Sequence, residues 1–221
     1  MPEKVATAAL FPPWTNTVIR TALAVLALGA GGTFTFLWLY VRTPYFTGQN
    51  EPVTQPIEFD HRHHVADDGI DCRYCHNTVE KSPSAGYPSS ETCMNCHAQI
   101  WNQSPLLAPV RQSYFTDTSL EWLRVHQLPD HVYFNHSIHV NKGVGCVSCH
   151  GRVDQMPEIM RKSPLTMGWC LECHRDPIPN LRPREFITSM TWKPDDARKV
   201  GEAVAKANGV HTRTSCSTCH R

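Results

Sequence analysis

The sequence has almost no excess charge of either sign. Its 221 residues contain 21 Lys and Arg against 20 Asp and Glu, a formal net charge of +1. Surfaces that bind nucleic acid usually carry a marked basic excess, so this balance argues against nucleic acid as a partner. The chain also lacks a strongly charged segment that would select a docking partner. Its function must therefore be inferred from hydrophobic segments and from potential metal ligands.

Only one long hydrophobic stretch is free of charge. Residues 21–41, TALAVLALGAGGTFTFLWLYV, contain no Asp, Glu, Lys or Arg. As a helix they would span about 30 Å, the thickness of a bilayer's hydrocarbon core. We predict a transmembrane anchor over residues 18–42 in contact with the lipid bilayer, its helix beginning at Thr15 or Asn16. A cleaved signal peptide, the alternative, has an apolar region of only about 7–15 residues.

No cysteine falls outside one motif. All ten belong to five copies of Cys-x-x-Cys-His: CRYCH (72–76), CMNCH (93–97), CVSCH (146–150), CLECH (170–174) and CSTCH (216–220). Random placement at this composition would yield roughly 0.03 copies, so the pattern identifies c-type haem attachment. Zinc modules pool three or four ligands, and disulfides need no histidine after each pair, so neither explains the motif.

The spacing follows from haem chemistry. Two thiols three positions apart add to the two vinyl groups of one porphyrin, and the next histidine then lies beneath the iron as proximal ligand. We therefore predict five covalent haems c. The attachment residues are Cys72, Cys75, Cys93, Cys96, Cys146, Cys149, Cys170, Cys173, Cys216 and Cys219. The proximal ligands are His76, His97, His150, His174 and His220.

Covalent haem also determines the orientation of the anchor. Haem c is attached outside the cytoplasm, so we predict a cytoplasmic N-terminus over residues 1–17 and a periplasmic haem domain over residues 59–221, joined to the anchor by an extended linker over 43–58. The location is then the inner membrane. The expected fold is mainly α-helical and irregular with little sheet, organised around the haems. Residues 194–209, PDDARKVGEAVAKANG, are typical of one surface helix.

The haem domain repeats a histidine pattern. FDHRHH begins at Phe59 and FNHSIH at Phe134, and each precedes two attachment motifs. His61 and His136 lie 75 positions apart, a spacing that the cysteines of the two parts nearly share. An internal duplication explains this, with one repeat over residues 59–133, another over 134–180, and the fifth attachment motif added after them.

Distal ligands are predicted from the repeated pairs. His61 with His64, and His136 with His139, lie three positions apart, so on a helical turn both imidazoles point the same general way. These four are our distal ligands. For the fifth we predict Met156, whose thioether would raise the haem's potential. The alternatives for this position are Met167 and His126, followed by His131 and His211, whereas His63 is expected to be exposed or to lie beside a haem propionate.

The pattern Phe-x-His-x-x-His before Cys-x-x-Cys-His resembles the class III multihaem cytochromes. In that class the first histidine usually caps the local haem and the second caps another. The resemblance implies that His61 serves the haem on Cys72 and Cys75, and that His136 serves the haem on Cys146 and Cys149. His64 and His139 would serve haems attached elsewhere.

One N-terminal span followed by five motifs, with DHVYFNHSIHVNKGVGCVSCHGRVDQM, LTMGWCLECHR and TSCSTCHR, is similar to the pentahaem subunit of alternative complex III. The similarity covers residues 15–221. It implies an electron-transfer subunit, without catalytic residues of its own, in a quinol-oxidising respiratory or photosynthetic membrane complex that delivers electrons to a periplasmic acceptor. Implied partners are an iron–sulfur subunit, integral subunits that bind quinol, and a monohaem cytochrome c. The haems would be mostly bis-histidine, with one His/Met haem.

Two other functions remain open at this point. A self-sufficient, membrane-anchored quinol dehydrogenase would oxidise quinol at its own haem, but such proteins commonly place methionine where this chain has Thr78, two residues after the first proximal histidine. A multihaem reductase would need one iron with an open position. The histidines and methionines suffice to fill every iron, so the sequence favours electron transfer.

Overall fold

The computed structural model describes residues 11–220. It divides into two compact units, Met1–Thr47 and Gly48–Arg221, which are considered separately. Residues 1–10, which form more than half of the predicted cytoplasmic segment, lie outside the described residues.

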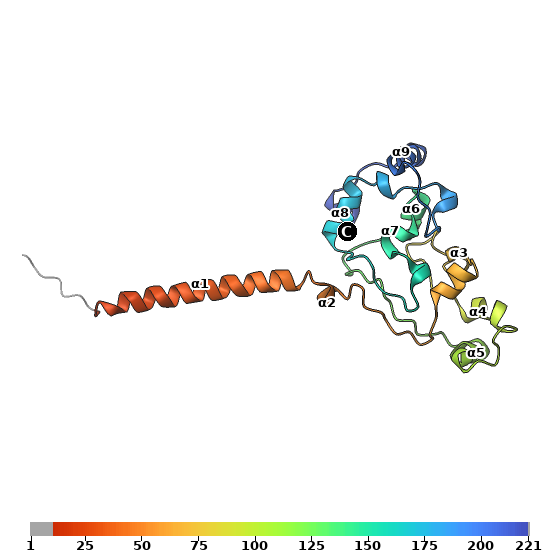
Figure 1. Cartoon of the computed structure of the whole chain (residues 1–221), viewed down its shortest axis with the longest axis horizontal. Helices are drawn as coiled ribbons and strands as arrows, with labels where there is room; N and C mark the ends of the chain where they lie inside the picture. Colours follow the sequence, from red (N-terminus) through yellow and green to blue (C-terminus); the bar gives the residue numbers. More distant parts are fainter. Residues whose placement is uncertain (1–10, 221) are drawn as a thin grey trace, which may run out of the picture. The chain divides into compact units, whose positions relative to one another are not determined.

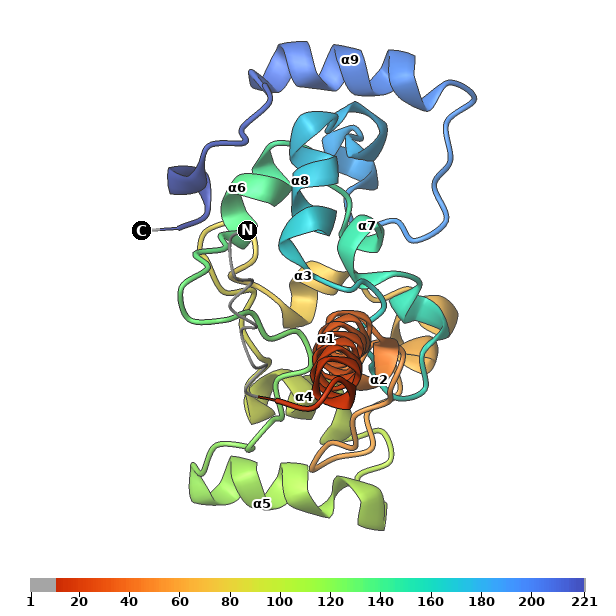
Figure 2. The same cartoon turned by 90° about the vertical axis from the view of Figure 1, so that its left-hand side faces the viewer.

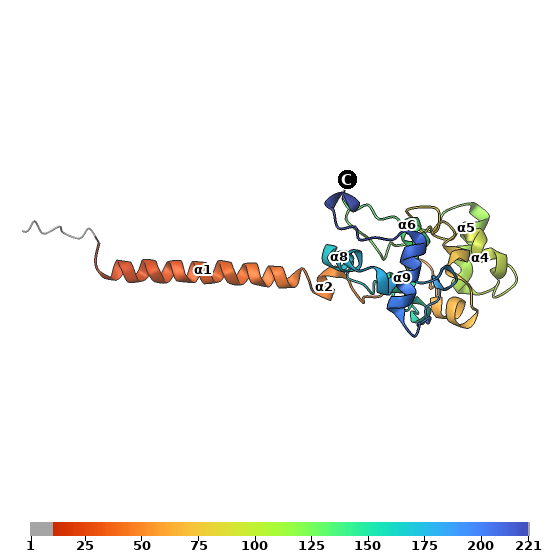
Figure 3. The ribbon, with the colours of Figure 1, turned by 90° about the horizontal axis from the view of Figure 1, so that it is seen from above.

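The first unit is dominated by helix α1, Trp14–Tyr40, which runs straight over its whole length (Figure 1, Figure 3). Its 27 residues reach about 40 Å, and none of them is buried. Among the described residues it is the one helix long and apolar enough to cross a membrane. It begins one or two residues before the predicted start, because Pro13 already has helical dihedral angles.

Aromatic rings and a cation gather at the C-terminal end of α1. The Tyr40 ring stacks on Phe36 with centroids 5.8 Å apart and meets Phe46 edge-on at 5.6 Å. The Arg42 guanidinium lies 3.8 Å from the centroid of the Trp38 ring. Such residues are enriched where a helix leaves the hydrocarbon core for the membrane interface. This end of α1 thus has the composition of an interfacial boundary.

Short helices joined by irregular segments make up the second unit. Residues 48–220 contain no strand, only three isolated bridges, so the expectation of a mainly helical and irregular fold is confirmed. The α-helices are α3 (Cys72–Cys75), α4 (Ser90–His97), α5 (Ala108–Thr116), α6 (His136–Asn141), α7 (Cys146–His150), α8 (Met167–Arg175) and α9 (Ala197–Asn208). A π-helix η1 (Arg62–Asp67) and the 3₁₀ turns η2 (Pro105–Leu107), η3 (Val153–Gln155), η4 (Ile178–Asn180), η5 (Arg184–Phe186) and η6 (Cys216–Thr218) complete the list.

The region predicted as an extended linker differs at its start. Helix α2, Pro44–Thr47, occupies the first part of it, since Pro44 supplies the φ angle that a first helical position needs. Beyond α2 the chain is extended and is bridged at Gln49 to Arg161 and at Pro52 to Met160. The second unit therefore begins alongside the segment that connects its third and fourth attachment motifs.

Helix α9 confirms the predicted surface helix. The Asp196 carboxylate caps its N-terminus by accepting from the Lys199 backbone N–H, and Gly209 ends it with a left-handed φ of 59°. The helix lies against η4, where a Cβ on Gly201 would overlap the Ile178 carbonyl oxygen. In the second unit, α9 and α5 lie at opposite ends with α3, α7 and α8 between them (Figure 2).

The conventional hydrophobic core is small. Seven hydrophobic residues are buried among those described: Ile57, Val110, Val140, Met156, Leu181, Ile187 and Ala205. A domain of this length normally buries far more apolar surface than these side chains provide. The attachment motifs, in contrast, lie on α3, α4, α7, α8 and η6 throughout the unit. This architecture fits a domain whose apolar interior is completed by prosthetic groups.

Candidate haem attachment and ligand sites

Each attachment motif begins in a helical segment: α3, α4, α7, α8 or the 3₁₀ turn η6. We number the motifs site one (72–76), site two (93–97), site three (146–150), site four (170–174) and site five (216–220). Residues three apart on such a turn face the same side, so both thiols of a site can reach one porphyrin edge, with the histidine next in the chain. No disulfide joins any of the ten cysteines, so every one of them is available for thioether formation.

The arrangement does not suit zinc. Within residues 11–220 no three His, Cys, Asp or Glu side chains converge as the ligands of a metal ion would. A structural zinc site needs four such ligands around one point. Haem iron needs only two protein ligands, because the porphyrin supplies the other four. The donor set of this chain therefore fits haem.

Backbone carbonyls hold the predicted proximal histidines. In four of the five sites the imidazole Nδ1–H donates to a carbonyl oxygen, which leaves Nε2 free to bind iron. The bonds are His76 to Gly86 (2.8 Å), His97 to Ile100 (3.0 Å), His174 to Arg213 (2.9 Å) and His220 to His131 (3.0 Å). At site three, burial lowers the pKa of His150 to about 3, so that its imidazole is held in the neutral, ligating form.

The second histidine of each repeated pair faces the proximal histidine of a more distant site. The ring centroids of His64 and His97 are 6.1 Å apart, and those of His139 and His174 are also 6.1 Å apart. A metal–imidazole bond is about 2.0 Å long, so two imidazoles on opposite sides of one metal have centres roughly 6 Å apart. The spacing fits one iron between each pair, at site two and at site four.

Carbonyls also fix these two distal candidates. The Nδ1–H of His64 donates to the Asp60 carbonyl at 2.9 Å, and that of His139 donates to the Asn135 carbonyl at 2.7 Å. In both cases the acceptor lies four residues earlier in the chain. The local turn therefore orients the imidazole before any ligand binds.

The first histidines of the pairs lie near sites one and three. The His136 and His150 rings have centroids 6.3 Å apart and are nearly parallel at 13°, a separation that fits an iron at site three. The Nδ1–H of His136 donates to the Pro83 carbonyl at 2.8 Å. Burial, and then the nearby His76, lower the pKa of His61 to about 4, so His61 lies close to the proximal histidine of site one.

The candidates for the fifth distal position lie in different surroundings. Met156 is buried after η3, which packs against η1, whereas Met167 is 68% exposed at the start of α8. His126 lies with its ring centroid 4.4 Å from that of His150, and its buried Nε2 has no hydrogen-bond partner. His211 is exposed. Met156 therefore stays a prediction for the fifth ligand.

His131 has a role that sequence reasoning missed. Its carbonyl oxygen accepts the Nδ1–H of His220, and its ring stacks against His220 with centroids 5.5 Å apart. The carbonyl lies on the Nδ1 side of His220, away from the nitrogen that would bind iron. His131 thus orients the proximal histidine of site five. Because its backbone carbonyl does this, the role could not be predicted from the residue type.

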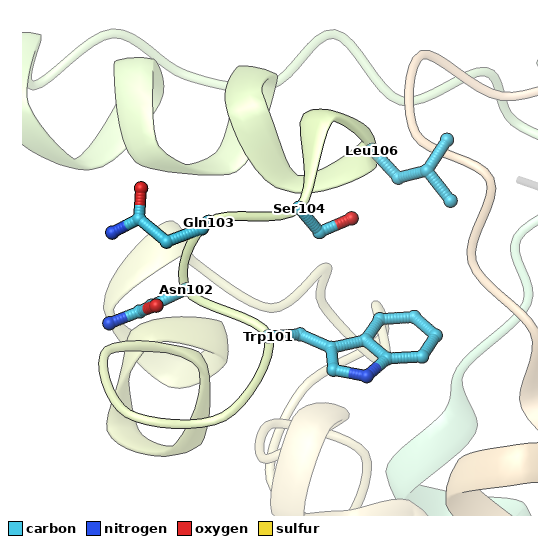
Figure 4. A pocket seen from close by; sticks show the side chains of 5 residues that line it. All are labelled: Trp101, Asn102, Gln103, Ser104 and Leu106. Atoms are coloured by element: carbon cyan, nitrogen blue, oxygen red, sulfur yellow. The ribbon is translucent and has the colours of Figure 1, made fainter.

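His63 is exposed, as predicted, and its ring stacks with Trp101 at 6.4 Å. Trp101 lines a surface pocket together with Asn102, Gln103, Ser104 and Leu106 (Figure 4). None of these five side chains is an acid, a base or a metal ligand of the usual kinds.

Five thioether motifs, carbonyl-held imidazoles and a small core define a multihaem c-type cytochrome. Residues 132–221 match the family described as cytochrome c7 and related cytochrome c. The chain is also 36% identical over 175 residues to the menaquinone reductase, multihaem cytochrome c subunit, of Nitratidesulfovibrio vulgaris strain Hildenborough. That similarity covers 76% of this chain and 77% of the relative. The chain belongs to the multihaem cytochromes c and carries covalent haem c.

Proposed function

We propose that this chain is a membrane-anchored pentahaem cytochrome c that carries electrons within a quinol-oxidising complex similar to alternative complex III. Electrons would enter from a quinol and iron–sulfur module and leave toward a periplasmic acceptor. The observation that carries the proposal is the pairing of His64 with His97 and of His139 with His174 at 6.1 Å. Each pair joins an imidazole from one turn to the proximal imidazole of another site.

The residues of the chain suit electron transfer better than catalysis. Haem iron supplies reversible one-electron chemistry. Two carbonyl-held imidazoles at one iron leave no position for a substrate, and fixed ligands lower the cost of rearrangement when the charge changes. At sites two, three and four the ring centroids of the paired histidines lie 6.1, 6.3 and 6.1 Å apart, a separation that fits one iron between two imidazoles.

Helix α1 supports attachment of the chain to a membrane. We propose that this helix crosses the inner membrane once, with the N-terminus in the cytoplasm and the second unit in the periplasm, where haem c is attached. Its aromatic end at Tyr40 then marks the periplasmic interface. A single anchor keeps the haem domain beside its partners, which we propose are an iron–sulfur subunit, quinol-binding integral subunits and a monohaem cytochrome c.

The relative supports a quinone-linked role but suggests a second direction. It is named as a subunit of a menaquinone reductase, so in that protein electrons pass to menaquinone. The same chain of haems could carry electrons either way, because direction depends on the potentials of donor and acceptor. Reduction of a quinone pool is therefore our second candidate function. A self-sufficient quinol dehydrogenase is the third, and would require this chain to bind quinol alone.

One experiment separates these functions. A menaquinol analogue is added to the full-length chain in mild detergent and, in parallel, to the native membrane complex, while haem absorbance reports reduction. We expect reduction only in the complex. Rapid reduction of the isolated chain would assign the quinol site to this chain. If the complex instead transfers electrons from pre-reduced haems to a menaquinone analogue and does not accept them from the quinol, the direction is reversed.

A further inference from the structure

Contacts between the attachment segments join them in an order that differs from their order in the sequence. The first contact links sites two and one. Asn95 lies between the cysteines of site two and Tyr74 between those of site one, and the Asn95 amide donates to the Tyr74 hydroxyl at 3.1 Å. The two attachment turns therefore touch through the residues they enclose.

Sites one and three meet through neighbouring carbonyls. The Cys146 backbone N–H donates to the Ile187 carbonyl at 3.0 Å, and the Cys72 thiol lies 4.0 Å from the carbonyl oxygen of Thr188, the next residue. The first cysteines of the two repeats thus lie against adjacent residues of one segment, Thr188 and Ile187.

Sites three and four share Asn180. Its carbonyl accepts from the Gly145 N–H at 3.5 Å, next to Cys146, and its side-chain amide donates to the Cys173 sulfur at 3.7 Å. Site four in turn meets the segment that leads into site five.

That last link is the imidazole of His174, which donates to the Arg213 carbonyl at 2.9 Å, three residues before Cys216. Helices α4, α3, α7 and α8 follow one another in this same order between the two ends of the unit in both views (Figure 1, Figure 2).

We infer that the five haem attachment sites form one unbranched series, in the order two, one, three, four, five. Within the first repeat this order runs against the sequence, from site two to site one. Within the second repeat it follows the sequence, from site three to site four, so the two repeats meet at Cys72 and Cys146. Exposure gives independent support. Of the ten cysteines, only Cys96 and Cys216 are exposed, and these belong to sites two and five, the two ends of the series.

The ends of the series are then the places where other redox proteins exchange electrons with the chain, a consequence that rests on the proposed function. The cysteines of sites one, three and four are only partly exposed. Beside site two, Ile100 is 61% and Trp101 65% exposed, which leaves an apolar surface available to a partner. The order itself does not depend on the identity of the donor or acceptor.

Iron positions test the order directly. We would determine the iron–iron distances in the native full-length protein by electron cryo-microscopy. The four shortest distances should join sites two and one, one and three, three and four, and four and five. An iron at site two that lies closer to site three, four or five than to site one would overturn the series. This readout holds whether or not quinol is the donor, so it fails separately from the proposed function.

A second test uses the two exposed ends, where removal of a site disturbs folding least. C216S with C219S removes site five, and C93S with C96S removes site two. Electron paramagnetic resonance redox titration then counts the remaining haems whose midpoint potential shifts. Each deletion should shift one haem, at site four and at site one respectively. Two or more shifted haems in either variant, or the same haem in both, would show a branched arrangement.

Discussion

The two repeats hold their histidines in nearly the same geometry but support them differently. In the first repeat Phe59 lies edge-on to His61 (4.7 Å, 85°) and stacks on His64 (4.4 Å, 23°). In the second, Phe134 lies edge-on to His136 (4.8 Å, 89°) and stacks on His139 (4.5 Å, 27°). The phenylalanine therefore sets the angle between the two imidazoles in both repeats.

Support for the first histidine is where the repeats differ. The Nδ1–H of His136 donates to the Pro83 carbonyl, which belongs to the first repeat, whereas the buried Nδ1 of His61 has no partner. No earlier repeat precedes His61 to supply a carbonyl. The residue before the first cysteine also differs, Asp71 in one repeat and Gly145 in the other. The two repeats therefore share the geometry of their paired histidines but differ in the contacts around them.

Removal of a distal histidine should have the largest effect, and should be equal in the two repeats. We expect H64A to convert one haem, at site two, from low spin to high spin, and H139A to do the same at site four, because each loses one of two axial ligands. Low-temperature electron paramagnetic resonance would measure the high-spin signal. H63A is the matched control, since His63 is exposed. A high-spin signal in H63A, or none in H139A, would contradict the assignment.

The residue before the first cysteine should tolerate change only in the first repeat. A Cβ at Gly145 would overlap the Nε of Arg182, whose buried guanidinium donates to the Ser189 carbonyl at 2.9 Å and cannot move freely. We expect G145A to destabilise the domain by about 1–3 kcal/mol, as overpacking does. Thermal unfolding should then begin several degrees lower.

The opposite substitution provides the comparison. D71G removes the carboxylate that caps α3 by accepting from the Arg73 N–H, and N-cap replacement by glycine typically costs only a few tenths of a kcal/mol. The loss of its bond from Thr188 (2.7 Å) adds to this. D71G should therefore unfold at a higher temperature than G145A. The reverse ranking would mean that Arg182 can leave its site at little cost.

Unequal support of His61 and His136 should separate the potentials of two haems. An imidazole whose Nδ1–H donates to a carbonyl is a more basic ligand and stabilises ferric iron. One hydrogen bond of about 0.5–1.5 kcal/mol corresponds to roughly 20–65 mV for a one-electron couple. The haem capped by His136 should therefore have the lower potential, other contributions being equal.

Spectroelectrochemical titration can measure this difference once the haems are assigned. H61M and H136M should each raise the potential of one haem, because methionine ligation favours ferrous iron. The haem whose potential rises in H136M is expected to have, in the native chain, a lower potential than the haem whose potential rises in H61M. If the haem capped by His61 has the lower potential in the native chain, burial or neighbouring charge outweighs the missing hydrogen bond.

Residue type predicted the attachment motifs, the long apolar helix α1 and the surface helix α9, because each depends on local spacing or hydrophobicity. The paired histidines were also predicted as distal ligands from spacing alone. The acceptors that orient the imidazoles could not be predicted from the sequence. Gly86, Pro83 and Arg213 act through backbone carbonyl groups, which every residue has. The series of sites was equally hidden, because Asn180 and Ile187 join sites that are distant in sequence.

The smallest effect we expect is a pH dependence confined to the first repeat. A hydrogen bond from the Arg73 guanidinium lowers the pKa of Asp71 to about 2, and Gly145 offers no counterpart in the second repeat. Because the folded pKa is depressed, the stabilisation is fully present above the unfolded value of about 3.9 and is lost as the pH falls through the folded value. The Asp71 side chain is 41% exposed, so solvent screening limits the gain to below about 1 kcal/mol.

D71N tests this titration with little other change, because asparagine also caps helices well. The thermal midpoint of the native chain should exceed that of D71N near neutral pH, and the difference should shrink between about pH 4 and pH 2 as the carboxylate is protonated. D195N, at an exposed aspartate, is the control and should show no such convergence. A difference that stays constant with pH would assign the effect of D71N to lost packing, because only an ionised carboxylate loses its advantage in acid.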